Sequence, residues 1–300
     1  MTIPAQIVDA HHHLWDLSHC HYPWLMERGV KRFFGDPSPI QKDYLAPDFV
    51  TDHGKLPIVK SVHIQVGVRE EDSVKETHWL QSVADEYGFP NAIVAFVNLT
   101  EPDLDAQLNA HGEAANLRGI RQIVGRSAEE DAKTGTSALL SDPAFADGLR
   151  LLAKHGLSFD LQVTPPLMNA AAKLFCVIPE IPLALCHCGS LSDHSAEGIA
   201  QWQTGLEALA NHENILCKIS GFGMFDHNWT VGSIRDQVLR VIDIFGPARV
   251  AFGSNFPVDS LHASFGEVMG AYLAITEGFS DDERREMFHD NAANFYRISL

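Results

Sequence analysis

Three histidines stand together near the start of the chain, in the stretch IVDAHHHLWD (residues 7–16). Successive side chains of a β-strand point to opposite faces, so His11 and His13 share one face and His12 lies on the other. Two imidazoles delivered to one point at a strand end suit a borderline divalent ion such as zinc. The chain has 16 histidines, however, and an isolated H-x-H is about as common by chance as in a real site.

A third histidine closes another apolar run. The stretch IPLALCHCGS (residues 181–190) predicts a buried strand that ends at His187. The last apolar run, AFGSNFPVD (residues 251–259), places Ser254 and Asn255 at the same kind of position. A lone histidine on an apolar strand is usually a hydrogen-bonded core group, but polar residues at three separate strand ends are much harder to explain by chance. The sequence therefore predicts one polar site built from all three.

Other polar residues share a strand face by the same alternation: His63 with Gln65, Gly119 with Arg121, Asp160 with Gln162, and Lys218 with Ser220. If Arg121 points inward, its guanidinium can form two hydrogen bonds to a substrate carboxylate. A structural ion pair is an equally good interpretation of this residue. Lys218 is expected to pair with a buried acid, and no G-x-S-x-G elbow surrounds Ser220. We expect the substrate to contact Arg121, Gln65, Gln162, Ser220 and Trp15.

Eight short apolar runs alternate with segments of helical spacing along the chain. The expected strands are Ile7–His13, Ile58–Val68, Ala92–Val97, Leu117–Val124, Leu157–Val163, Leu183–His187, Ile215–Ser220 and Val250–Gly253. The expected helices are Asp72–Tyr87, Leu104–Ala115, Ser141–His155, Leu167–Val177, Ala196–Asn211, Ser233–Phe245, Ala263–Thr276 and Asp281–Phe295, with Ser280 as the cap of the last. This alternation predicts a parallel sheet. The strand count, the polar strand ends and the lack of a G-x-G-x-x-G favour a single-domain α/β fold over residues 1–300, a (β/α)8 TIM barrel.

One connection departs from this pattern. Residues 14–49, which follow the first strand, are rich in proline and aromatic residues (HYPWL, KRFFGDPSP) and show no period of their own. Loops of this length are usually functional or disordered, and this one is too apolar for disorder. We predict a lid over the barrel mouth; an exposed aromatic loop would serve equally as a contact surface in a homo-oligomer.

The bulk properties exclude several classes of protein. A formal charge of −17 and a pI near 5.3 argue against nucleic acid or an anionic membrane as the partner and leave a small-molecule substrate. We expect neither an export signal nor a membrane-spanning segment, because no apolar run is long enough. The five scattered cysteines are expected to be free thiols in a reducing cytoplasm.

Several motifs occur together: DAHHHLWD, YPWL, RGIRQIVG, LCHCG, CKISGF, FGSNFPVD and the C-terminal NAANFYRI. In these motifs the chain resembles the amidohydrolase superfamily, and most closely the amidohydrolase-related branch (amidohydrolase 2) that contains sugar-lactone and dicarboxylate-lactone hydrolases. The resemblance runs from Val8 to the C-terminal end and implies a (β/α)8 barrel with its site at the strand C-termini. It implies that His11 and His13 match the first-strand metal pair and that His187 matches the sixth-strand histidine. Asn255 falls where an aspartate is usual.

The asparagine affects both the metal and the base. An amide offers a carbonyl oxygen to a metal, but it has no negative charge and no titratable proton. A site of His11, His13 and His187 is therefore expected to hold one zinc or manganese ion weakly. If a metal is kept, another group must act as base, either Asp259 or His63. Alternatively, the site is metal-independent and histidines act directly on an activated ester.

These observations predict a hydrolase that opens a small anionic lactone, a sugar-acid or dicarboxylate lactone, by water attack at the barrel mouth. His187, Asn255, Asp259 and His63 are the catalytic candidates. Two alternatives stay open: a metal-dependent decarboxylase of a related branch, and a degenerate barrel that only binds a ligand. Release of CO2 would distinguish the first, and binding without turnover the second.

Overall fold

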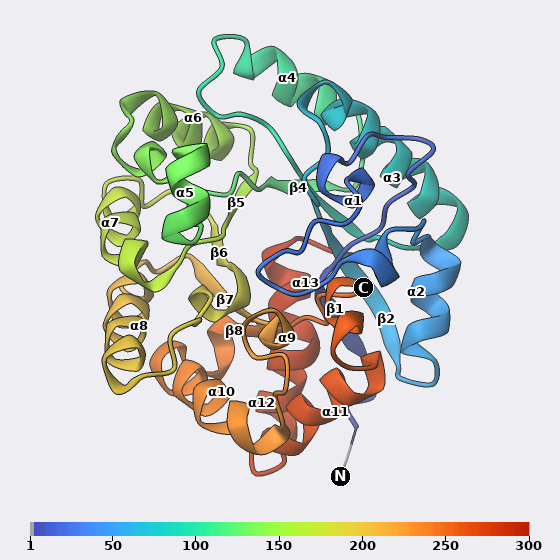
Figure 1. Ribbon diagram of the computed structural model, residues 1–300, viewed down its shortest axis with the longest axis vertical. Helices are drawn as coiled ribbons and strands as arrows, with labels where there is room; N and C mark the ends of the chain where they lie inside the picture. The colour runs from blue at the N-terminus through green and yellow to red at the C-terminus, as the bar shows by residue number, and fades with distance from the viewer. Residues whose placement is uncertain (1–2, 300) are drawn as a thin grey trace.

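Eight parallel strands form the centre of the protein, each hydrogen-bonded to the next in chain order (Figure 1). The computed structural model describes residues 3–299. The strands are β1 (Ile7–His12), β2 (Ile58–Ile64), β3 (Ala92–Ala95), β4 (Leu117–Ile120), β5 (Ser158–Leu161), β6 (Leu183–Leu185), β7 (Ile215–Ile219) and β8 (Val250–Phe252). The predicted (β/α)8 barrel is confirmed, and each strand is shorter than the apolar run from which it was predicted.

The seam between β8 and β1 is closed beyond the strand ends. The Asn255 N–H donates to the carbonyl of His11 and the His13 N–H donates to the carbonyl of Phe256, both at 2.7 Å. The buried Asp9 carboxylate accepts from the Ser254 N–H (2.9 Å) and hydroxyl (2.6 Å). These contacts hold the first and last polar strand ends next to each other, as the predicted site requires.

Helices surround the sheet at the predicted places. They are α2 (Ala46–His53), α3 (Ser73–Tyr87), α4 (Leu104–His111), α6 (Pro143–Lys154), α7 (Pro165–Cys176), α8 (Ala196–Ala210), α10 (Val231–Phe245) and α11 (Phe265–Ile275). The last predicted helix is α12 (Asp281–Arg285) and α13 (Asn291–Phe295) joined by a π-helical turn, and Ser280 caps it with Glu283 in a capping box. Of these helices α2 was not predicted, and neither were the short helices α1 (Pro23–Met26), α5 (Ala128–Thr134) and α9 (Phe222–Phe225).

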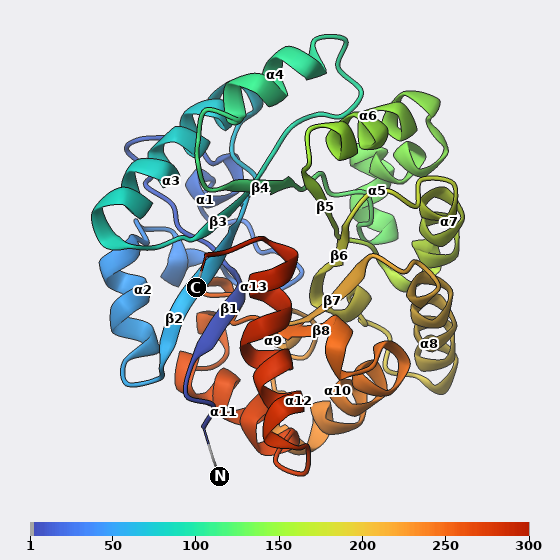
Figure 2. The ribbon, with the colours of Figure 1, turned by 180° about the vertical axis from the view of Figure 1, so that it is seen from behind.

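The C-terminal helix closes one end of the barrel, the end seen in Figure 2. Small side chains of six strands, among them Ala10 and Ala184, form an interior cluster with Ala292, Ala293 and Tyr296. Because this end is filled with packed side chains, an open pocket has room only at the opposite end, where α1, α5 and α9 lie in Figure 1.

The connection after β1 is not structureless. It contains the helix α1 (Pro23–Met26) and a 3-10 turn (Ser38–Ile40), and α2 begins at Ala46, so the excursion is shorter than the predicted 14–49. Trp15, Tyr22 and Leu25 are fully buried, which explains why an aromatic-rich segment is ordered here. Its role as a lid is still a prediction.

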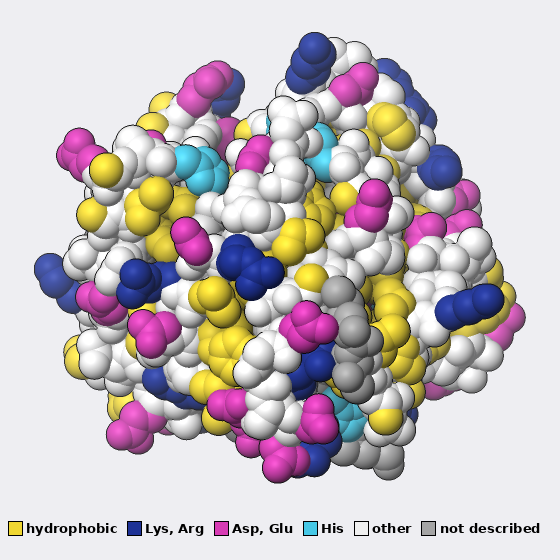
Figure 3. Space-filling model, turned by 90° about the horizontal axis from the view of Figure 1, so that it is seen from below, with side chains coloured by type: hydrophobic (Ala, Val, Ile, Leu, Met, Phe, Trp, Pro, Cys, Tyr) yellow, Lys and Arg dark blue, Asp and Glu magenta, His cyan; other side chains and the backbone are white. Residues whose placement is uncertain are grey.

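Charges are mixed on the protein surface. On the face shown in Figure 3, Asp and Glu side chains are interspersed with Lys and Arg side chains. The Lys and Arg side chains form no basic stripe on this face. The five cysteines are unpaired, and only Cys176 is exposed. Within residues 3–299, no helix combines the length and apolarity needed to cross a membrane.

Candidate active site

A cavity of about 300 Å³ opens at the mouth of the barrel. Five predicted site residues line it: His13, Arg121, Gln162, His187 and Asn255. Its outer wall comes from the excursion after β1, through Trp24, Arg32, Phe33 and Phe34. A larger hollow, about 810 Å³, lies on the outer surface between α8 and α10 and is lined by none of the predicted site residues.

The predicted histidines at the ends of β1 and β6 lie together. The ring centroids of His11 and His13 are 5.1 Å apart, and those of His11 and His187 are 4.4 Å apart. The sequence spacing thus indicated correctly that the first two histidines share a face.

A β-bulge decides which face that is. Val8 and Ala10 belong to the interior cluster, so strict alternation would turn His12 inward as well. Between Asp9 and His12, however, β1 advances three residues while β2 advances two. The extra residue reverses the alternation. His12 consequently stacks outside the barrel on Phe49, with centroids 4.2 Å apart, and its two neighbours face the interior.

His187 reaches the cavity through a left-handed turn. Alternation along β6 would direct it outward, because Ala184 faces the interior. Instead His187, Cys188 and Ser190 have φ angles of 52°, 49° and 57°. The indole N–H of Trp202 donates to the Cys188 carbonyl at 2.6 Å and supports the turn. Such backbone is unfavourable for non-glycine residues and concentrates at functional sites.

The imidazoles facing the cavity are kept neutral. Burial, followed by the positive charge of Arg121, lowers the pKa of His13 to about 3 and holds that of His187 well below its ordinary value. Burial, followed by the positive charge of Lys218, also lowers the pKa of His11 well below its ordinary value. A neutral imidazole has a free lone pair at pH 7, so these side chains can accept a proton. Ser220 lies behind His187, with its hydroxyl 2.9 Å from Nδ1.

Asn255 connects the cavity to a buried carboxyl group. Its φ of 56° lies in the left-handed region, which asparagine tolerates better than most residues. The amide Oδ1 lies 3.2 Å from Nε2 of His13, and Nδ2 donates to Oδ1 of Asp259 at 3.0 Å. Burial raises the pKa of Asp259 to about 7. Asp259 is 1% exposed and lies behind Asn255, so the structure does not bring it to the cavity wall.

Arg121 is held rigidly at the cavity wall. Its guanidinium donates to the carbonyl of Gln65 and, at 3.1 Å, to Oε1 of Gln162. The Gln65 side chain donates back to the Arg121 carbonyl at 3.1 Å. Gln65 therefore supports the arginine from outside the cavity lining. Both terminal nitrogens of Arg121 have neutral partners, so no carboxylate contacts the guanidinium, and Asp160 acts on its charge only from a distance.

Sequence reasoning missed Arg126. This residue lines the cavity, its Nε is buried without a partner, and no ion pair is formed by its guanidinium within residues 3–299. The charge of Arg126 acts on nearby Asp131, and Glu130 lines the same cavity. Because no carboxylate is paired with the guanidinium, it can still bind an anion in the cavity. Its signal was weak, because Arg126 follows the strand in RGIRQIVGRS and no alternation rule applies beyond a strand end.

Like Gln65, Ser220 and Asp259, the predicted site residues His63 and Trp15 lie away from the cavity lining. His63 accepts the Leu14 N–H through Nδ1 at 3.0 Å, and its Nε2 is buried without a partner. Trp15 is fully buried and donates its indole N–H to the carbonyl of Lys42 at 2.7 Å. Both positions are structural in this arrangement, because neither side chain borders the space available to a substrate.

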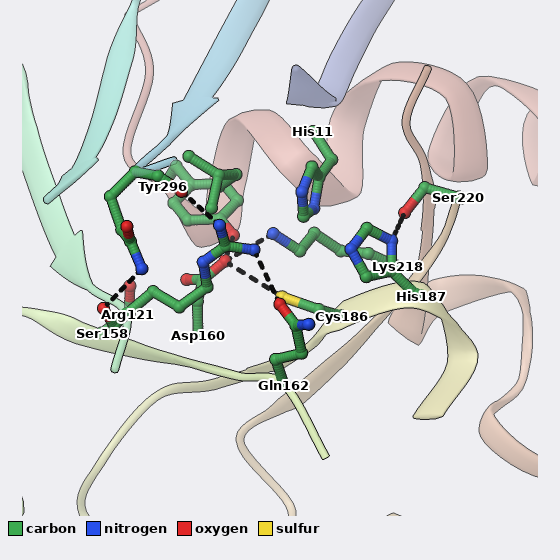
Figure 4. A network of polar contacts seen from close by, with 12 residues as sticks. His11, Arg121, Ser158, Asp160, Gln162, Cys186, His187, Lys218, Ser220 and Tyr296 are labelled. Atoms are coloured by element: carbon green, nitrogen blue, oxygen red, sulfur yellow. Dashed lines mark hydrogen bonds and ion pairs between the residues drawn. The ribbon is translucent and has the colours of Figure 1, made fainter. Parts of the chain in front are cut away.

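Below the cavity lies a buried ionic network (Figure 4). Lys218 forms an ion pair with Asp160, and both side chains are fully buried. The Tyr296 hydroxyl donates to the same carboxylate oxygen at 2.8 Å. The expectation that Lys218 pairs with a buried acid is confirmed.

The histidine cluster does not fit a divalent metal in this arrangement. Both ring nitrogens of His11 are buried and lack partners, as a waiting ligand would. However, within residues 3–299 no group of three or more His, Cys, Asp or Glu residues is arranged to hold a metal ion. No carboxylate joins the imidazoles, and the charges of Lys218 and Arg121 act on them. The positive charges of Lys218 and Arg121 repel a metal cation at the histidine cluster.

The fold and the cavity together define an α/β-barrel protein whose polar site lies at the C-terminal ends of the strands. The amidohydrolase family profile matches residues 8–298, so the chain belongs to the amidohydrolase family, in its amidohydrolase 2 branch.

Named relatives and solved structures agree with this assignment. The chain is 41% identical over 294 residues to the protein y4mH of Sinorhizobium fredii, covering 97% of this chain and 98% of that one. It is 28% identical over 306 residues to L-fucono-1,5-lactonase of Burkholderia ambifaria, with coverage of 97% and 95%. A crystal structure of an amidohydrolase from Burkholderia multivorans with bound zinc matches with a TM-score of 0.83 and 25% identity over 98% of this chain and 100% of that one. The family and the lactonase relative support a hydrolase.

Proposed function

We propose that the protein hydrolyses a small anionic lactone, a sugar-acid or dicarboxylate lactone, in the cavity at the barrel mouth. The observation that carries this proposal is the combination of a neutral imidazole, His187, with two arginines, Arg121 and Arg126, around one cavity. The imidazole can take a proton from water. The arginines can bind an anionic substrate and stabilise the negative charge that develops on its carbonyl oxygen. The similarity to L-fucono-1,5-lactonase supports a sugar lactone. That lactone is itself neutral, so the anionic group of the substrate is proposed from the two arginines alone.

The reaction needs one water molecule. Its oxygen bonds to the lactone carbonyl carbon while His187 accepts a proton from it. The negative charge that develops on the carbonyl oxygen is stabilised by Arg121, whose charge no contacting carboxylate compensates. The ring C–O bond then breaks, and His187 returns the proton to the leaving ring oxygen. The product is an open-chain hydroxy acid.

Arg126 is proposed to bind the acidic group of the substrate. Its guanidinium lines the cavity and has free donors, whereas the two terminal nitrogens of Arg121 already donate to Gln65 and Gln162. Trp24, Phe33 and Phe34 provide an apolar wall for the sugar or ring face. We propose that this part of the excursion after β1 is the lid, because Phe33 is 46% exposed and rests on Phe225.

We propose that these residues catalyse the reaction without a metal. The imidazoles lie together without a carboxylate, in an arrangement that does not fit a metal ion. Weak binding of zinc or manganese by His11, His13 and His187 is compatible with the step above, which does not depend on it. An introduced anionic ligand, in the Asn255→Asp variant, is expected to tighten zinc binding.

A panel assay tests the proposal. Purified protein is incubated with sugar-acid lactones, including L-fucono-1,5-lactone, and with dicarboxylate lactones, while acid release is followed with a pH indicator. Opening of at least one anionic lactone, retained after exhaustive chelation, is expected. No opening of any lactone would overturn the proposal; CO2 release from aromatic acids would then indicate the decarboxylase, and ligand binding without turnover the degenerate barrel.

A further inference from the structure

We infer that Asp259 is a positioning residue that decides which end of the Asn255 amide faces the cavity, and that it thereby switches the site between a resting and an active form. The inference rests on the proposed lactone hydrolysis and identifies the residue that controls it. Asp259 does not touch the cavity and acts only through Asn255, which does.

The geometry around His13 is the first argument. Its Nδ1 lies 2.7 Å from the carbonyl oxygen of Ile64, which can only accept a hydrogen bond, so this nitrogen must carry the proton. In a neutral imidazole Nε2 is then a lone-pair acceptor. Asn255 Oδ1, also an acceptor, faces it at 3.2 Å. Two acceptors cannot bond each other, so this contact needs a different partner.

Two arrangements resolve the conflict. In the first, the amide of Asn255 is turned over, and Nδ2 donates to Nε2 of His13 while Oδ1 faces Asp259. Two oxygens then meet, so the Asp259 carboxyl must carry a proton and donate it. In the second, Asp259 is ionised and accepts from Nδ2, as the 3.0 Å contact shows. Oδ1 and Nε2 then face the cavity together as a pair of acceptors.

Only the second arrangement can hold the attacking water. A water molecule beside the two acceptors donates one proton to this pair and keeps the other for His187, which orients its oxygen toward a substrate in the cavity. In the first arrangement the amide itself occupies Nε2, and the acceptor pair is lost. The ionised form of Asp259 is therefore the active form.

The surroundings of Asp259 place this change near neutral pH. The N–H of Gly223 in α9 and the amide of Asn255 lower its pKa, but burial outweighs them and raises it to about 7. Of the titratable side chains packed around it, Tyr272 in α11 stays neutral because its pKa is raised well above its ordinary value. His262 follows on the same turn and is held by the carbonyl of Phe34 at 2.8 Å. The titration of His187 lies lower, so it does not mask this one.

A pH profile tests the inference. Initial rates, corrected for spontaneous lactone opening, are measured from pH 6 to 8 on a lactone that the wild type opens. For a group of pKa near 7, kcat/KM should rise about tenfold over this range. Asp259→Asn should be slower and independent of pH. Glu76→Gln, which removes another buried carboxyl whose pKa burial raises to about 8, and His262→Gln should both keep the wild-type rise.

A second measurement is independent of turnover. In protein labelled with 13C at the aspartate carboxyl, the signal absent from Asp259→Asn should titrate near pH 7. A profile that persists in Asp259→Asn, or an Asp259 signal that is constant from pH 5 to 9, would overturn the inference. Failure of the wild type to open any lactone would instead sink the proposed function, and the carboxyl titration still decides whether the amide switch exists.

Discussion

The two ends of the barrel interior treat polar groups in opposite ways. At the closed end, Asp160 receives Lys218 and Tyr296 on the same carboxylate oxygen, and all three side chains are fully buried. At the mouth, both ring nitrogens of His11 and the Nε of Arg126 are buried without partners. Burying a charge is costly unless it is paired, so the closed end is built for stability. We propose that a ligand completes the unpaired groups at the mouth.

The largest expected effect is a loss of activity that distinguishes His187 from His12, two histidines of similar burial. His187→Asn removes the proposed proton acceptor, so kcat/KM for lactone opening should fall by about 10²–10⁴-fold while the protein stays folded. The matched variant His12→Asn changes a histidine that faces Ser61 and Phe49 outside the barrel. It should lower the melting temperature and leave turnover in place. Equal activity losses in both variants would remove the contrast between mouth and scaffold.

Removing the Lys218–Asp160 ion pair at the closed end should lower the stability of the fold. Lys218→Met leaves the buried Asp160 carboxylate with two neutral donors, the Tyr296 hydroxyl and the Cys186 thiol, so the free energy of unfolding should fall by about 3–5 kcal/mol. Denaturant unfolding followed by fluorescence measures the loss. The double variant Lys218→Met/Asp160→Asn removes both charges and should recover a large part of it. A loss below about 1 kcal/mol in the single variant would show that this pair is not the stabilising contact its burial implies.

The smallest of the three effects concerns the substrate's charge. Arg126→Gln removes one charge-assisted contact of about 1.5–3 kcal/mol, so KM for an anionic lactone should rise about 10–100-fold with little change in kcat. A neutral lactone of the same ring size serves as the matched control and should be unaffected. If both substrates respond equally, Arg126 supports the cavity wall and does not recognise the anion.

The alternation of apolar and polar residues carried most of the prediction. It located all eight strands, the principal helices and the shared face of the first-strand histidines, because these depend on local periodicity. It also placed Asp160 with Gln162 and Lys218 with Ser220 on common faces, as the interior network and the His187 contact show. The order of motifs indicated the family, which the profile over residues 8–298 shows.

The same rule failed wherever the chain left regular geometry. It could not separate Arg126, which lines the cavity with free donors, from Arg121, whose terminal nitrogens are occupied. It also selected Trp15 and His63, which the structure buries away from the cavity. Side chains beyond a strand end have no fixed direction, so their positions depend on neighbours far away in the sequence.

By itself, the sequence determined a barrel of the amidohydrolase type with histidines at two strand ends and, at a third, an amide in place of a carboxylate. Only the tertiary structure decided where those groups point. The extra residue in β1 is defined by pairing with β2, and the left-handed turn at His187 is held by Trp202. Likewise, only the folded chain brings Asp259 against Asn255 and His13 against Ile64. Hydrogen-bond partners distant in sequence set these directions, and local periodicity contains no information about them.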